Sequence, residues 1–185
     1  EEAPLAWFAV PGVPRSRIEA WLASDSPAAQ LLGASHALST NLRGAAVEQL
    51  QQLRTSTDPR LALLAETQIW RTEIVTAGPA DVDQWQQILT RNSAPTGGGP
   101  WLVVGEGLAR HGHPDRAALA YLRVPVLYPQ QRQLAARGLL AAAQLATKQG
   151  QTDEARRMLA ELARDYPDTP PAEQGAAMLQ SQGSD

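Results

Sequence analysis

The sequence predicts an all-α fold built as a stack of antiparallel helix pairs, that is, an α-solenoid. The chain has 32 alanines but only nine valines and four isoleucines, and this composition favours helix over strand. Apolar residues recur at spacings of three and four through most of the chain, and no segment alternates apolar and polar residues over the length of a strand. Short breaks at glycine and proline separate the periodic segments, so neighbouring helices are expected to run antiparallel.

Length and composition exclude several classes of protein. The 185 residues suffice for one domain with a sizeable core or two very small ones. The absence of cysteine excludes disulfides, cysteine-ligated zinc, iron–sulfur clusters and thiol catalysis. A formal net charge of −3 argues against nucleic acid as a partner. The longest apolar runs, such as 139–143, are far shorter than a membrane span, so we expect no transmembrane segment.

The first part of the chain carries clear helix start and stop signals. Ser26–Pro27 and Asp58–Pro59 each place a capping side chain before a proline at the first helical position. Asp81 is the expected cap of a further helix, and Gly78–Pro79 is expected to stop the helix before it, which we extend to Val75. Later helices are expected at about 101–111, 114–127, 131–149, 152–166 and 171–181.

The second part of the chain contains an internal repeat with a period of 38 residues. Aligning Gly112 with Gly150 brings four further pairs into register: Ala117 with Ala155, Tyr121 with Leu159, Val124 with Leu162, and Pro129 with Pro167. Small residues let two helices approach closely, bulky residues fill the space between them, and proline ends the second helix. Because one helix pair cannot bury its own apolar face, such pairs are expected to stack.

The first helix of this repeat has the pattern Trp101-x-x-Val104-Gly105-x-x-Leu108, which resembles the tetratricopeptide repeat. The resemblance implies a right-handed solenoid whose first helices line a concave groove that binds a peptide or a partner helix. The long period and the Tyr-Pro endings are similar to repeats of bacterial envelope proteins, such as outer-membrane assembly lipoproteins and Tol–Pal-associated periplasmic proteins. That similarity favours a periplasmic or exported location slightly over a cytoplasmic one.

The chain is therefore expected to have four parts. These are an extended proline-rich arm at 1–14, a degenerate helical-repeat region at 15–92, a Gly/Pro linker at 93–100, and two repeat units plus a capping helix at 101–181.

The family pattern transfers groove-facing positions to particular residues. In the first unit these are Leu102, Glu106, Ala109 and Arg110. In the second unit they are Arg137, Leu140, Gln144, Thr147 and Lys148. The lysine–asparagine clamp of chaperone-binding members is absent, because Leu102 replaces the lysine and Glu106 and Gln144 replace asparagines. The basic residues would form a mildly basic strip for an acidic segment; the alternative is that they are solvated surface residues.

No catalytic constellation is visible, so we expect no enzyme activity and no cofactor. His111 and His113 could ligate a metal ion, but only Asp115 accompanies them locally, and solvated turn histidines are the favoured interpretation. The leading hypothesis is a non-enzymatic scaffold that binds another protein in its groove. The alternative is a structural component that self-associates as a homo-oligomer through its open ends or through Trp7 and Phe8 of the arm.

Overall fold

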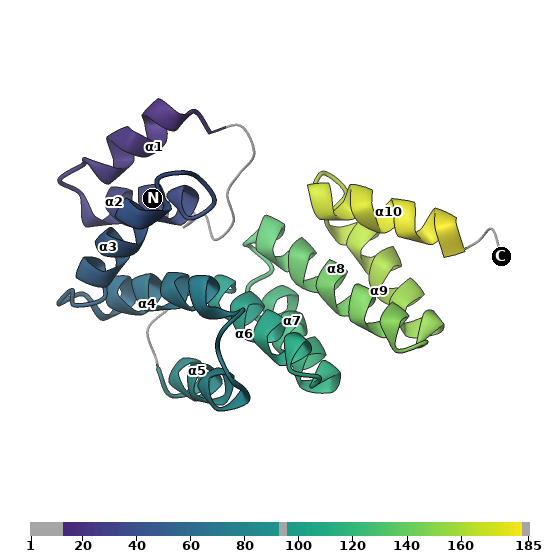
Figure 1. Cartoon of the computed structure of the whole chain (residues 1–185). Helices are drawn as coiled ribbons and strands as arrows, with labels where there is room; N and C mark the ends of the chain where they lie inside the picture. The colour runs from purple at the N-terminus through teal and green to yellow at the C-terminus, as the bar shows by residue number, and fades with distance from the viewer. Residues whose placement is uncertain (1–12, 93–95, 183–185) are drawn as a thin grey trace. The chain divides into compact units, whose positions relative to one another are not determined.

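The fold is all-α, as predicted. The computed structural model describes residues 13–92 and 96–182, and all regular structure within these ranges is helical (Figure 1). The helices form two compact units, α1 to α4 and α5 to α10. Residues 1–12 of the expected arm and 93–95 of the expected linker lie outside the described residues.

The first unit contains four helices that pack in chain order. They are α1 (Arg15–Leu22), α2 (Pro27–Ala37), α3 (Arg43–Leu53) and α4 (Pro59–Glu73). The expected caps are present: the Ser26 hydroxyl accepts from the backbone N–H of Ala29, and Asp58 accepts from that of Arg60 at 2.9 Å. Helix α2 approaches α1 so closely that a Cβ at Gly33 would lie 2.8 Å from the Leu22 nitrogen.

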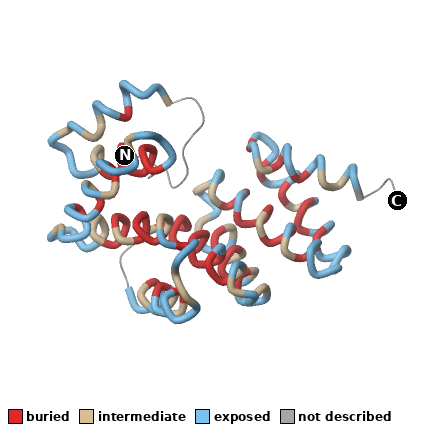
Figure 2. The backbone as a smooth tube through the Cα atoms, in the orientation of Figure 1, coloured by how far each residue is buried: buried red, intermediate tan, exposed pale blue. Residues whose placement is uncertain are grey.

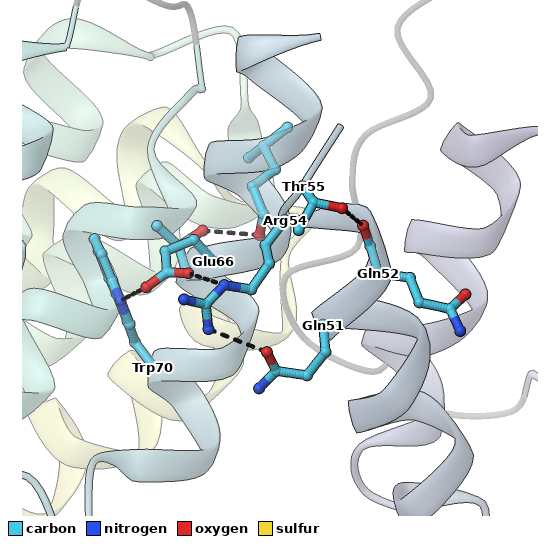
Figure 3. A network of polar contacts seen from close by, with 8 residues as sticks. Gln51, Gln52, Arg54, Thr55, Glu66 and Trp70 are labelled. Carbon is cyan, nitrogen blue, oxygen red and sulfur yellow. Dashed lines mark hydrogen bonds and ion pairs between the residues drawn. The ribbon is translucent and has the colours of Figure 1, made fainter. Parts of the chain in front are cut away.

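A polar network joins the end of α3 to α4 in this unit (Figure 3). Arg54 Nε lies 3.2 Å from Glu66 Oε2, and the buried Trp70 donates from Nε1 to Glu66 Oε1 at 3.2 Å. Arg54 also donates to Gln51 Oε1 at 3.1 Å. One carboxylate thus satisfies the buried indole N–H and holds the turn that follows α3.

The second unit contains the predicted repeat. Its helices are α5 (Pro79–Arg91), α6 (Gly99–Arg110), α7 (Pro114–Leu127), α8 (Arg132–Lys148), α9 (Thr152–Asp165) and α10 (Pro170–Gln182). Each helix packs on the next, and α10 also packs on α8, as a capping helix of the stack should. The buried residues follow the sides on which α6 to α9 pack (Figure 2).

Close packing within α6–α7 depends on the small residue that the repeat pattern identifies. A Cβ added to Gly105 would lie 2.5 Å from the ring of the buried Tyr121. Both helix pairs turn at a glycine with positive φ, since Gly112 and Gly150 each have φ of +74°. These glycines adopt the left-handed conformation that other residues avoid.

Hydrogen bonds between residues 33 or 34 positions apart join successive pairs. His111 Nε2 lies 2.9 Å from the Ala77 carbonyl oxygen, and the Gly98 N–H donates to Gln131 Oε1 at 2.8 Å. Gln149 Nε2, at the turn after α8, donates to Asp115 Oδ1 of α7 at 3.2 Å. Each turn of the second unit is therefore fixed to the neighbouring pair and not only to its own helices.

Three local expectations differ from the structure. Helix α4 ends at Glu73, and Val75 is 70% exposed beyond it. Helix α5 begins at Pro79, so Asp81 is its third residue; its carboxylate accepts from the Gly78 N–H at 2.7 Å and thus reaches back to the start of the helix. Helix α6 begins at Gly99, inside the segment expected to be a linker, and residues 97–100 are buried.

Candidate protein-binding face

The candidate face lies on α6 and α8, the first helices of the two pairs. Three of the predicted positions on each helix are equivalent by the 38-residue repeat: Leu102 and Leu140, Glu106 and Gln144, and Arg110 and Lys148. Within each helix they are four residues apart, so they lie close to one line along it.

The first position of each set belongs to the core. Leu102 is 4% exposed and Leu140 is 5% exposed. A partner could therefore touch little of either leucine, and their side chains stabilise the stack. The exposed part of the candidate face begins one turn further along each helix, at Glu106 and Gln144.

The structure brings Glu106 and Arg137 together around Tyr121. Burial raises the pKa of the Tyr121 hydroxyl, the negative charge of Glu106 raises this pKa further, and Arg137 lowers it. Burial also lowers the pKa of Arg137, an effect that the charge of Glu106 partly offsets. Residues from α6, α7 and α8 thus form one electrostatic cluster, in which Glu106 and Arg137 act on the Tyr121 hydroxyl in opposite directions.

Arg110 and Lys148 differ from this cluster because their charges are not compensated. Both are exposed, and neither forms an ion pair with another described residue. Each lies in the last turn of its helix, where the backbone carbonyls favour a cation. Of the remaining predicted residues, Ala109 is half-buried and Thr147 is exposed, its hydroxyl donating to the Ala143 carbonyl at 3.0 Å.

The turn histidines have different surroundings. His111 is half-buried and lies within hydrogen-bonding distance of the Ala77 carbonyl, whereas His113 is exposed. Where side chains are described, no group of three histidine, aspartate or glutamate residues is placed to hold a metal ion. His111 therefore has a structural contact that the sequence pattern did not indicate.

Two further contacts were not predicted. The Arg123 guanidinium lies 4.1 Å from the centre of the Trp101 ring, and Arg116 of α7 pairs with Asp83 of α5 at 2.6 Å. Arg116 thus faces α5, and Arg123 faces α6. Comparing α7 with α9 would have singled out both positions, because the equivalents of the two arginines are Glu154 and Glu161.

A comparison with known families identifies the second helix pair. Residues 137–169 match the family model of the tetratricopeptide repeat. This segment is similar to a tetratricopeptide repeat. The matched segment spans most of α8, all of α9 and the Tyr-Pro ending that follows α9. No curated protein and no solved structure matches the chain.

Tetratricopeptide repeats generally mediate protein–protein interaction and are generally non-catalytic. The match covers the second of the two units that the sequence alignment defines, and the α6–α7 pair shares its register at an offset of 38 residues. Among the described helices, none is both long and apolar enough to cross a membrane.

Proposed function

We propose that the protein is a non-enzymatic scaffold that binds a peptide segment or helix of another protein along α6 and α8. The observation that carries this proposal is the pair Arg110 and Lys148. They are equivalent by the repeat, exposed and not in ion pairs with described residues. Two such cations on successive first helices favour an acidic segment that runs across both helices.

The neighbouring cluster adds specificity to this proposal. Glu106 and Arg137 lie beside Tyr121 and oppose each other in charge, so a partner that displaces one must provide a replacement for it. An acidic side chain of the partner would compete with Glu106 for Arg137, whereas a basic one would meet Arg110 and Lys148. The expected partner is thus acidic on the side that faces the scaffold.

The period and the Tyr-Pro endings support a place in the bacterial cell envelope, with the protein exported to the periplasm. Self-association into a larger structural assembly is the alternative function. Its proposed contact residues Trp7 and Phe8 lie outside the described residues.

Affinity capture from an extract of the source organism, followed by mass spectrometry, tests the scaffold function. The test variant is Arg110→Glu combined with Lys148→Glu. The matched control is Arg157→Glu combined with Arg164→Glu, which changes the net charge equally on the exposed side of α9. We expect a protein captured by wild type and control to be lost by the test variant, with the affinity of that purified partner falling at least about tenfold.

Equal capture by the test variant would refute the assignment of the binding face. Capture of the protein's own chain alone would favour the self-associating alternative. Circular dichroism should show that all three proteins are folded. Both variants should melt at a slightly lower temperature than wild type, because Arg110 and Lys148 are replaced in last turns that favour a cation, and Arg157 and Arg164 lose exposed ion pairs.

A further inference from the structure

A second surface, on the outward side of α7, has the features of a docking site. Leu119 is 65% exposed and Val126 is 73% exposed, and the half-buried Leu122 lies between them in the sequence. Spacings of three and four residues place these side chains on one side of the helix, so they form a continuous apolar stripe. Single exposed apolar residues are ordinary, but a continuous stripe on a water-facing side is not.

Helix α9 provides an internal reference for the same positions. The equivalents of Leu119, Leu122 and Val126 are Arg157, Ala160 and Arg164, which are all exposed. The second pair thus folds in the same register with charged residues at the two outermost positions. Apolar residues on the outward side of α7 are therefore not required by the fold.

Arginine residues border the stripe. Arg116 pairs with Asp83 of α5, and the Arg123 guanidinium lies over the ring of Trp101 of α6. Arg91, at the end of α5, forms no ion pair with a described residue. A hollow of about 350 Å³ between α5 and α7 is lined by Asp83, Gln86, Gln87, Thr90, Arg91 and Arg116.

Size and charge together indicate the occupant. The stripe extends only about 10 Å along the helix, at about 1.5 Å per residue, which suits one helix of a partner. A stable interface of any kind needs about 800 Å² from each partner, more than three side chains can supply, so the stripe suits a single weakly held helix and not a stable dimer. An antiparallel two-fold contact between copies of α7 would also bring the arginine border of each copy against that of the other, which is unfavourable.

We propose that the outward side of α7 binds an amphipathic helix of a partner protein, with apolar residues against the stripe and acidic residues toward Arg91 and Arg123. This surface is separate from the face on α6 and α8. The protein would therefore hold two partner segments at once, one on each side of the same helix pair.

The test uses two fluorescent model helices of equal length, one of leucine and glutamate and one of leucine and lysine. The variant is Leu119→Arg combined with Val126→Arg, which copies the residues of α9. We expect wild type to bind the glutamate helix at least about tenfold more tightly than this variant does, and more tightly than it binds the lysine helix. Arg91→Glu should weaken binding of the glutamate helix and leave the melting temperature unchanged.

Equal affinity of wild type and the double variant for the glutamate helix would overturn the proposal, as would preference for the lysine helix. Light scattering tests whether a second copy of the chain covers the stripe instead. A wild-type dimer that the double variant abolishes would mean that a second copy covers the stripe, which also overturns the proposal. Because the glutamate helix also suits Arg110 and Lys148, the effect of Leu119→Arg/Val126→Arg is measured again in the Arg110→Glu/Lys148→Glu background. We expect the stripe substitutions to weaken binding in that background too, so failure of one face is distinguishable from failure of the other.

Discussion

The pairs α6–α7 and α8–α9 lie in one unit and fold in the same register with different side chains. Their turns agree closely: Gly112 and Gly150 share φ of +74°, and Tyr128 and Tyr166 at the ends of α7 and α9 share φ of −133°. Their outward sides differ, apolar on α7 and charged on α9. Core and turns thus define the repeat, while the outward side can vary in sequence without changing the fold.

The cores of the two pairs also differ, in a compensated way. The first pair combines Gly105 with Tyr121, and the second combines Ala143 with Leu159 at the equivalent positions. A smaller residue on one helix accompanies a larger residue on the other, as close packing requires. We expect each helix pair to pack closely only when both residues of its combination are present.

The largest expected effect comes from mixing the two combinations. Gly105→Ala places a Cβ 2.5 Å from the Tyr121 ring, so we expect it to lower the free energy of unfolding by about 1–3 kcal/mol. Tyr121→Leu alone should lower it by leaving a cavity. The double variant has the pair of residues found in the second helix pair, except for their surroundings. Its loss in free energy of unfolding should be smaller than the sum of the losses of the two single variants.

Urea denaturation of the wild type, both single variants and the double variant measures this coupling. Strict additivity of the two losses would contradict the idea that Gly105 and Tyr121 are matched to each other.

An intermediate effect should appear in the pH dependence of stability, because Tyr121 titrates and its equivalent Leu159 does not. Burial, and then the charge of Glu106, raises the pKa of Tyr121 in the folded state. The unfolded chain ionises this tyrosine near its ordinary pKa of about 10. The contribution of Tyr121 to the free energy of unfolding is therefore constant below that pH and falls as the pH rises above it. Tyr121→Phe should reduce this fall.

Unfolding free energies at about pH 8 and about pH 11 test this expectation. Tyr166→Phe is the matched comparison, since burial also raises the pKa of Tyr166 in the second pair. An unchanged pH dependence in Tyr121→Phe would mean that the Tyr121 hydroxyl ionises equally well in the folded protein.

The smallest effect is expected at the edge of α7. Arg116 pairs with Asp83 of α5, whereas its equivalent on α9, Glu154, pairs with Arg157 of the same helix. Both pairs are exposed, so Arg116→Ala should lower the free energy of unfolding by no more than about 1 kcal/mol. A loss well above this value in urea denaturation would show that the contact between α5 and α7 is a larger part of the stability of the unit.

Helical periodicity and caps were enough to predict the helices, because Ser26 and Asp58 act locally. The start of α6 was not predictable in this way. Three consecutive glycines are typical of a linker, but Gly98 is buried because it packs on Val124 and donates to Gln131, 33 residues away. The candidate face was predicted as a set of positions, but the burial of Leu102 and Leu140 depends on neighbouring helices that no local pattern describes.

The hydrogen bonds between successive turns of the second unit have a further consequence. Each reaches only to the adjacent pair, from Ala77 to His111, from Gly98 to Gln131 and from Asp115 to Gln149. None of these three hydrogen bonds involves α9 or α10. The number of helix pairs can therefore change. A gene duplication of 38 codons between α9 and α10 would add one pair and leave the interfaces among α5 to α9 unchanged, while α10 would cap the new pair in place of α8–α9.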